Sequence, residues 1–219
     1  MHNVTVAFAA LLVMLLSYFF GCFNASFMVS HFIIRDDVRK HGSGNAGLTN
    51  FYRTYGAKYA LLVIACDMGK TVAACLLGSF FFRCLGWDGT LGTLLAGLGC
   101  ELGHIFPVFY GFRGGKGILS GGTLVLLLNW RVAAVAWALF LLLWLTTRYV
   151  SLASITATCS APITVYFVYG HNWLYTGLCL AVAALVVWCH RENIQRLLHG
   201  TEKKFKWHVN PTEGKEPPQ

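Results

Sequence analysis

The sequence predicts an all-α integral membrane protein with about seven transmembrane helices. Hydrophobic residues make up 56% of the 219 residues and charged residues only 12%, which is about half the charged share of a soluble domain. Apolar runs close to the roughly 20 residues that a helix needs to cross a bilayer follow one another along the chain. Basic residues gather between these runs, almost all of them in alternate connections. Together these observations place the chain in lipid.

The expected spans follow from the apolar runs, in order. They lie at about residues 4–30, 59–82, 90–110, 117–130, 132–147, 151–169 and 172–189. The first run has no Lys or Arg ahead of it and no small-residue cleavage site after it, so we expect a retained span and not a signal peptide. The fourth and fifth runs are short and meet at residues 129–131. They form either a tight helical hairpin or a shallow pair that does not cross fully.

Lys and Arg decide the expected orientation, because they concentrate in cytoplasmic loops. One side of the membrane receives Arg35, Arg39, Lys40, Arg53, Lys58, Arg113, Lys116, Arg148, Arg191, Arg196, Lys203, Lys204, Lys206 and Lys215. The opposite side has only Arg83 and Arg131. We therefore expect the N-terminus outside and the C-terminus in the cytoplasm. The net charge of +8 then reflects topology and gives no reason to expect nucleic acid as a partner.

Residues 1–202 are expected to form a single membrane-embedded domain. Residues 203–219 are charged and contain proline, so we expect a disordered cytoplasmic tail whose Lys and Trp side chains contact anionic head groups. Eight cysteines fall singly inside apolar segments, with no CxxC pair and no His partner at zinc spacing: Cys22, Cys66, Cys75, Cys84, Cys100, Cys159, Cys179 and Cys189. We expect neither a disulfide framework nor a metal site.

Three clusters of glycine and polar residues lie on the expected cytoplasmic side. The first, at residues 41–56, has many glycines and small polar groups, and a flexible linker is its plain alternative. Its segment Gly42–Gly47 fits the dinucleotide pattern GxGxxG, but no strand precedes it, so we discard that match.

The second cluster, at residues 103–122, places Gly114, Gly115 and Gly117 around Lys116 where the fourth span begins. Backbone N–H groups, a helix N-terminus and an ammonium group converge on an anion in such a segment. It is not a Walker loop, because no Ser or Thr follows Lys116 and the first glycine of that motif is missing. Glycines that allow close helix packing are an equal alternative.

The third cluster, at residues 190–202, follows the last span. On a helix His190 and Asn193 share a face, with Arg196 beside Asn193, although a solvated juxtamembrane helix also explains this charge pattern. Within the second span Asp67 and Lys70 are three residues apart. Such an intramembrane pair suggests a function, but a self-neutralising pair that ties the first loop to the bundle is slightly favoured. Glu101 and His104 have the same spacing and are expected to reach the interface.

In this order the clusters resemble the PlsY family, the acyl-phosphate-dependent glycerol 3-phosphate acyltransferases of bacteria. The resemblance covers residues 41–202 and is carried by Ser43-Gly44-Asn45, Gly47, Thr49-Asn50, Arg53 and Gly56; by Asp67 and Lys70; by Gly103-His104, Phe106-Pro107, Phe112 and Gly114-Gly115-Lys116-Gly117; by Arg148-Tyr149-Val150-Ser151-Leu152-Ala153-Ser154; and by His190-Arg191-Glu192-Asn193-Ile194, Arg196-Leu197 and Gly200-Thr201-Glu202. The chain departs from the family at Thr71 and at Ile118-Leu119-Ser120, beside the expected phosphate contacts.

The resemblance implies transfer of a fatty acyl group from acyl phosphate to the 1-position of glycerol 3-phosphate, at the cytoplasmic face of a bacterial cell membrane, with no cofactor, no metal and no obligate protein partner. It implies catalytic roles for Ser43, Arg53, Lys116, His190 and Asn193. The implied substrate-binding residues are Asn45, Thr49, Asn50, His104, Gly114, Gly115, Gly117, Ser151, Arg196 and Glu202. The glycine loop would hold a substrate phosphate, and the acyl tail would lie between helices.

Two features of the reaction have alternatives, namely the base and the number of transfer steps. The base that removes the hydroxyl proton is either His190 or the phosphate of the donor. No nucleophile–base pair suggests an acyl-enzyme, so direct transfer is the simpler scheme.

Three competing interpretations are less favoured. His31 and Asp36 satisfy the HxxxxD pattern of other glycerolipid acyltransferases, but the chain lacks the long polar stretch that would fold into their soluble domain. A secondary transporter would predict polar groups near the midplane and an inverted repeat. A structural subunit would not explain why glycine and polar clusters share one side.

Overall fold

The computed structural model describes residues 2–206, and all of its regular elements are helical. In order these are α1 (His2–Cys22), α2 (Ala25–Met28), the π-helix η1 (Val29–Ile33), the short 3-10 helix η2 (Val38–Lys40), α3 (Leu48–Tyr55), α4 (Ala60–Cys84), α5 (Gly89–Ile105), the 3-10 helix η3 (Val108–Tyr110), α6 (Ile118–Leu128), α7 (Trp130–Thr147), α8 (Val150–Val168), α9 (Trp173–Cys189) and α10 (Arg191–Leu198). The expected all-α fold is confirmed for this part of the chain.

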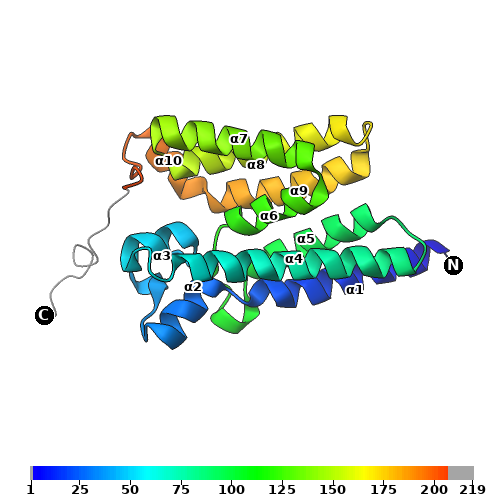
Figure 1. Ribbon diagram of the computed structural model, residues 1–219, viewed down its shortest axis with the longest axis horizontal. Coiled ribbons are helices and arrows are strands. Elements are labelled where there is room, and N and C mark those ends of the chain that lie inside the picture. Colours follow the sequence, from blue (N-terminus) through cyan, green and yellow to red (C-terminus); the bar gives the residue numbers. More distant parts are fainter. Residues whose placement is uncertain (1, 207–219) are drawn as a thin grey trace, which may run out of the picture.

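The long helices form two layers with α6 between them (Figure 1). One layer contains α1, α4 and α5, and the other contains α7, α8 and α9. In the first layer α5 packs closely on α1, because a side chain on Gly99 or Gly103 would meet the α1 backbone at Met14 or Tyr18. Two glycines four residues apart allow this close approach of helices in a membrane. In the second layer Val132, Val165 and their neighbours form a buried core.

Five helices, or segments built from helices, are long and apolar enough to cross a membrane, and a sixth is obtained if α9 and α10 count as one bent span. Helix α6 covers 11 residues, or roughly 16 Å at 1.5 Å per residue, against a bilayer core of about 30 Å. It is joined to α7 at Asn129, which ends α6 and caps α7. The number of seven crossings therefore stays a prediction, and α6 is the helix that departs from it.

The first expected span, 4–30, corresponds to a candidate span at Val4–Ile33, which contains a short interruption between α1 and α2. Helix α1 ends at Cys22, and the Asn24 side chain accepts a hydrogen bond from the Phe27 backbone N–H to begin α2. The Asn24 amide also donates to the backbone carbonyl of Ala46, at 2.9 Å. This hydrogen bond ties the break to the first polar cluster.

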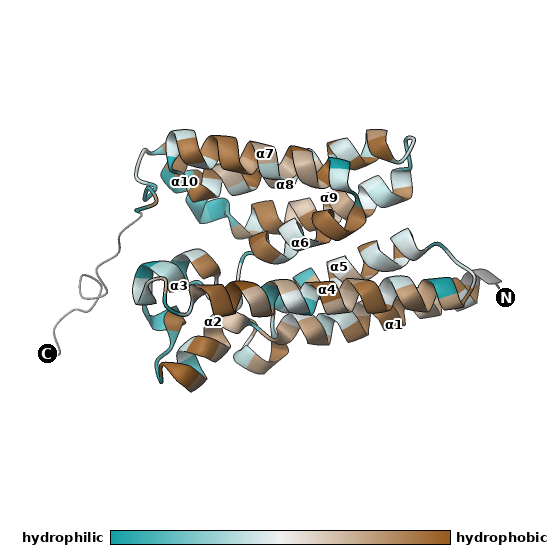
Figure 2. Ribbon diagram, in the orientation of Figure 1, coloured by the Kyte–Doolittle hydropathy of each residue, from teal (hydrophilic) through white to brown (hydrophobic). Residues whose placement is uncertain are grey.

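The polar clusters lie at one end of the bundle and the N-terminus at the other. Helices α2, α3 and α10 share this end (Figure 1), and hydrophilic residues concentrate there in Figure 2. The grouping on one side is therefore confirmed. The prediction that this side faces the cytoplasm concerns a membrane that is not part of the structure, and it stays a prediction.

Candidate active site

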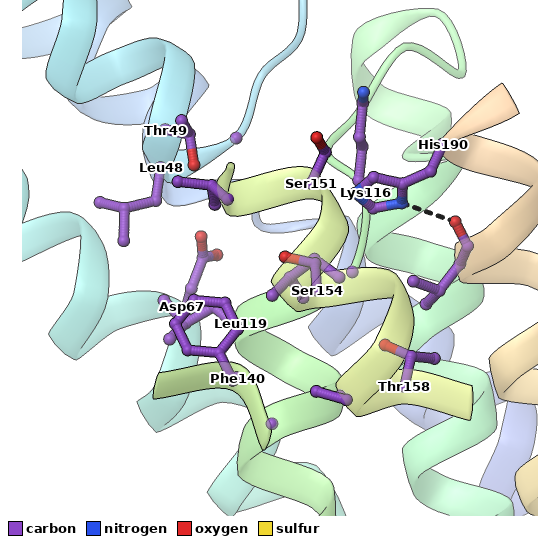
Figure 3. A pocket seen from close by; sticks show the side chains of 18 of the residues that line it. Leu48, Thr49, Asp67, Lys116, Leu119, Phe140, Ser151, Ser154, Thr158 and His190 are labelled. Atoms are coloured by element: carbon purple, nitrogen blue, oxygen red, sulfur yellow. Dashed lines mark hydrogen bonds between the residues drawn. The ribbon is translucent and has the colours of Figure 1, made fainter. Parts of the chain in front are cut away.

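A cavity of about 780 Å³ lies between the two layers. Its polar lining comes from Ser43, Asn45, Thr49, Asn50, Arg53, Asp67, His104, Lys116, Ser151, Ser154, His190 and Glu202. Its apolar lining includes Ile64, Leu119, Leu124, Val125, Ala136, Trp137, Phe140, Ala157, Ala161, Cys179, Val182 and Val186. Along α8 the lining runs from Ser151 and Ser154 near the helix start to Thr158 (Figure 3), and Ala157 and Ala161 add apolar surface. The cavity thus joins a polar end to an apolar arm.

The first cluster is organised around Asn50, on helix α3. Its side-chain amide donates to the backbone carbonyls of Val38, His41 and Asn45 at 3.0–3.1 Å, and its side-chain oxygen accepts from the Ser43 backbone N–H. A flexible linker would have no such buried centre, so that alternative is wrong for residues 41–56. Asn50 borders the cavity, but its side chain makes its hydrogen bonds to the backbone of residues 38–45.

The glycine loop between α5 and α6 is held against this first cluster. The carbonyl of Gly114 accepts from the Ala46 backbone N–H at 3.3 Å and from the Asn45 side chain at 3.4 Å. Gly115 donates to the carbonyl of His104, and a side chain on Gly115 would collide with the His104 ring. Gly117 adopts φ = 80° as it caps α6, a conformation that favours glycine. The loop therefore presents Lys116 to the cavity at the N-terminus of a helix.

The third cluster surrounds Lys116 from α9 and α10. The ammonium of Lys116 donates to the side-chain oxygen of Asn193, and the Asn193 amide donates to Glu202 at 2.7 Å. Glu202 also accepts from the Ser151 hydroxyl at 2.8 Å and pairs with Arg196 at 2.7 Å. One hydrogen-bonded network therefore connects three separate stretches of sequence.

Electrostatic effects in this network follow from burial and contacts. Burial opposes ionisation of Glu202, but hydrogen bonds from Arg196, Asn193 and Ser151 outweigh it and hold the pKa of Glu202 below its usual value. Burial and the charge of Arg196 lower the pKa of Lys116, while Glu202 opposes that shift. Glu202 therefore acts as the anion that compensates two neighbouring cations.

His190 follows the last residue of α9 and lines the cavity. Its Nδ1 lies 2.7 Å from the carbonyl of Val186, which can only accept, so Nδ1 carries a proton and Nε2 is left as an acceptor (Figure 3). Burial and the positive charge of Lys116 lower the pKa of His190 to about 4, although the Val186 contact opposes this. The ring is therefore neutral at physiological pH.

Arg53 reaches the cavity from α3, on the opposite side from α10. Its guanidinium donates to the backbone carbonyl of Lys203 at 3.1 Å. Burial and the charge of Arg196 hold the pKa of Arg53 below its usual value, although the charge of Glu202 opposes this shift. Arg53 from α3 and Lys116 from the glycine loop thus bring two cations to one polar end.

Asp67, Lys70 and His104 form a buried cluster behind the glycine loop. The ammonium of Lys70 lies 2.8 Å from Asp67 and 2.9 Å from Nδ1 of His104, and it donates to the carbonyls of Gly21 and Phe23. Asp67 also accepts from the Ala25 backbone N–H. The pair therefore fixes the break between α1 and α2, whereas we expected it to tie down the first loop. The expectation that Glu101 and His104 reach the interface is wrong, since they are 1% and 3% exposed.

Eleven of the fifteen expected site residues line the cavity; Asn193, Arg196, Gly114 and Gly115 do not. Asn193 and Arg196 act on residues that do, and the two glycines shape the loop. His104 supports Gly115 from behind. The sequence analysis did not single out Phe140, Trp144 or Phe205, which also line the cavity. Their apolar side chains carry no pattern that distinguishes them from lipid-facing residues.

The competing HxxxxD pair does not form a site. Asp36 pairs with Nε2 of His41 at 2.8 Å, while the His31 ring stacks on Phe27. Neither His31 nor Asp36 borders the cavity. Among residues 2–206, no group of three His, Cys, Asp or Glu side chains is arranged to hold a metal ion. The last four residues that the structure describes, 203–206, belong to the expected tail and contact the site; residues 207–219 lie outside the description.

The fold and the site define an integral membrane protein with a cavity whose cationic end joins an apolar arm, a layout that suits an enzyme acting on lipids. Comparison with known proteins makes this specific. The family model of glycerol-3-phosphate acyltransferase matches residues 11–200. The chain therefore belongs to the glycerol-3-phosphate acyltransferase family, in agreement with the resemblance found in its motifs.

Individual relatives agree with this assignment. A glycerol-3-phosphate acyltransferase of Syntrophomonas wolfei is 40% identical over 197 residues, covering 90% of this chain and 96% of the relative. One of Finegoldia magna is 38% identical over 189 residues, covering 86% and 92%. Two crystal structures of the integral membrane acyltransferase PlsY are similar, each covering 90% of this chain. The glycerol 3-phosphate form has a TM-score of 0.79 at 37% identity and is covered to 96%, and the lysophosphatidic acid form has 0.77 at 36% and is covered to 95%.

Proposed function

We propose that this glycerol-3-phosphate acyltransferase takes its fatty acyl group from acyl phosphate and places it on the 1-hydroxyl of glycerol 3-phosphate. The products are lysophosphatidic acid and phosphate, in the first acylation of phospholipid synthesis. The observation that carries the proposal is one continuous cavity, which has cationic side chains at one end and an apolar arm at the other. Similar structures are named as forms with glycerol 3-phosphate and with lysophosphatidic acid, which are the acceptor and the product of this reaction.

The polar end is suited to two phosphate groups. Lys116 and Arg53 supply charge, the start of α6 supplies backbone donors, and the side chains of Ser43 and Thr49 supply hydroxyl groups. Ser151 is tied to Glu202 and so faces the same end. We assign phosphate binding to Lys116, Arg53 and Ser43, whereas Asn193 and Arg196 hold Lys116 and Glu202 in place.

The apolar arm is suited to the acyl tail. Cys179 on α9 and His190 just beyond the end of that helix both line the cavity and lie 11 positions apart in sequence, or roughly 16 Å along a helix. Leu119 and Phe140 flank the arm from α6 and α7 (Figure 3). A tail placed there leaves its carbonyl beside Lys116 and Ser151, which is where charge develops during transfer.

The proton of the attacking hydroxyl is best accepted by the phosphate of the donor. His190 is the alternative, and its Nε2 is free to accept a hydrogen bond. With a pKa lowered to about 4, however, His190 is a weak base at neutral pH. We therefore give His190 the role of orienting the hydroxyl.

Direct transfer follows from these assignments. The hydroxyl oxygen of glycerol 3-phosphate attacks the acyl carbonyl, the bond from that carbon to the phosphate oxygen breaks, and the proton leaves on the released phosphate. Because acyl phosphate is already an activated mixed anhydride, alignment and charge neutralisation are the main tasks of the protein. No cofactor, metal or obligate protein partner is required.

The site is proposed to face the cytoplasm of a bacterial cell, in its inner or plasma membrane. The polar end of the bundle carries most of the basic residues of the chain, which favours a cytoplasmic position. The seven-crossing topology is part of this proposal.

Comparison of donors with purified protein tests the proposed function. We expect lysophosphatidic acid to form from acyl phosphate and glycerol 3-phosphate, without added nucleotide or coenzyme A and in the presence of a chelator. The same acyl chain should be inert as acyl-CoA. Strict dependence on acyl-CoA would contradict the proposal.

A further inference from the structure

The segment Thr201–Lys206 crosses the site after α10 and is held there at both ends. Gly200, at φ = 70°, reverses the chain, and the backbone N–H groups of Thr201 and Glu202 both donate to the carbonyl of Arg196. Glu202 then anchors the beginning of the segment through its side-chain network with Ser151. The segment is thus fixed to α10 and α8 where it starts.

Its far end is attached to the opposite walls of the cavity. The backbone N–H of Phe205 donates to the carbonyl of Arg148 at 2.8 Å, and Lys204 lies over the ring of Tyr149. On the other side, Arg53 of α3 donates to the carbonyl of Lys203. These contacts stretch the segment between α3 and the junction of α7 with α8.

The ring of Phe205 fills the space between those walls. It stacks on Tyr52 of α3 with ring centroids 5.4 Å apart, and it meets Trp144 of α7 edge to face at 5.3 Å. All three rings line the cavity. Aromatic pairs of this geometry are favourable beyond the area they bury. One side chain therefore bridges α3 and α7 at the cavity wall.

We propose that residues 201–206 form a strap that seals the cavity against water, with Phe205 as a positioning residue that makes transfer outrun hydrolysis of the acyl donor. The inference rests on acyl phosphate being the donor. Water that reaches the carbonyl replaces the acceptor hydroxyl: its oxygen bonds to the acyl carbon, the bond to phosphate breaks, and fatty acid and phosphate are released. Exclusion of water prevents this side reaction. The family model ends at residue 200, and the motif resemblance ends at Glu202, so Phe205 lies beyond both.

The test measures fatty acid and lysophosphatidic acid in parallel, from one acyl phosphate, for three variants. Phe205→Ala should raise the ratio of hydrolysis to transfer at least severalfold. Phe205→Leu, which keeps an apolar side chain, should restore most of the wild-type ratio. Lys206→Ala, at the neighbouring exposed position, should leave the ratio unchanged and serves as the matched control.

The outcomes separate the strap from the donor assignment. Failure of the wild-type protein to use acyl phosphate rejects the proposed donor, whatever the variants do. Wild-type activity together with an unchanged ratio in Phe205→Ala overturns the strap, even if both rates fall. If Phe205→Ala does not fold, Tyr52→Leu removes the stacking partner from the other side and should raise the same ratio.

A second measurement is independent of the donor. Cys179 lies in the apolar arm of the cavity and is buried. Its modification by a small water-soluble maleimide, located by mass spectrometry, should be faster in Phe205→Ala than in wild type or Lys206→Ala. Equal rates in all three proteins would show that the strap does not exclude water.

Discussion

The side-chain oxygen of Asn193 accepts a hydrogen bond from the ammonium of Lys116, although 77 positions separate the two residues in sequence. Asn193 is only 9% exposed, and its amide group is bound to Glu202. The contact fixes the direction in which Lys116 points. Lys116 is thereby held ready for an anion, and the cost of ordering a long side chain is met before substrate arrives.

This relationship predicts coupling between the two residues in turnover. Lys116→Ala removes a charge-assisted contact worth about 2–4 kcal/mol in the transition state, a loss on the order of a hundredfold or more in rate. Asn193→Ala should cost less, because the charge remains but loses its support. In the double variant the losses should fall short of additive, measured as kcat/KM for glycerol 3-phosphate. Strict additivity would mean that Asn193 acts on something other than Lys116.

Gly115→Ala should disrupt the glycine loop. The added methyl group would collide with the ring of His104, which Lys70 holds from the other side, so the loop has to move and carry Lys116 with it. We expect a severe loss of transfer activity with the protein still folded in the membrane. Gly69→Ala is the matched control, because a methyl group there meets nothing within 4 Å. Equal activity of the two variants would remove the loop from the site.

The lowered pKa of His190 predicts the pH dependence of the reaction. A His pKa near 4 means that His190 stays neutral as the pH falls through 6.5, so its protonation does not set the acid limit of activity in that range. His190→Gln should lower the rate but keep the same acid limb in a pH–rate profile. A limb that disappears in the variant would make His190 the general base.

The predicted topology can be mapped with single cysteines and a reagent that does not cross membranes. Labels at Asn45, Arg113 and Thr201 should react from the cytoplasm, and a label at Asp88 from outside. Arg113 is exposed, whereas a cysteine at Gly115 would clash with His104. The exposed native residues Cys66, Cys84 and Cys159 need replacement first. Reaction of the first three positions from different sides of the membrane would contradict the predicted topology.

The HxxxxD pattern and the cavity predict different effects of replacing His31. His31→Ala should retain most of the activity, because this ring stacks on Phe27 and does not border the cavity. Transfer rates from acyl phosphate provide the measurement. Asp36→Ala loses its pairing with His41 and should show at most a moderate effect through the first loop. Complete loss in His31→Ala would restore the HxxxxD interpretation.

Local sequence was sufficient for the helices and for most of the site. Apolar runs of 18 or more residues have few structures open to them in lipid, so their helices could be placed from composition alone. The glycines around Lys116 and the polar residues at 190–202 identified two site segments for a similar reason, since each type of residue has a narrow range of uses. The grouping of basic residues also placed these segments at one end.

Other features depend on packing between segments distant in sequence, which no local pattern encodes. The role of Lys70 in closing the α1–α2 break rests on carbonyls of Gly21 and Phe23, almost fifty positions away. The short apolar run at 117–130 indicated a break near residues 129–131, where α6 stops at Leu128, but it left open whether the helix crosses the bilayer. The sequence predicts a disordered tail at Phe205 because the residues around it are mostly charged. In the structure its ring packs against Tyr52 and Trp144, which are distant in sequence.

The short length of α6 affects where a molecule from water and a molecule from lipid can meet. In Figure 1 this helix starts further from the α3–α10 end than α4 and α7 do, so the glycine loop descends into the bundle to reach it. A water-soluble acceptor and a lipid-soluble donor can then meet at the foot of that descent, each arriving from its own medium. One additional helical turn would lift the loop by about 5.4 Å and move the meeting point toward water. The length of α6 thus sets the depth at which a polar molecule becomes a membrane lipid.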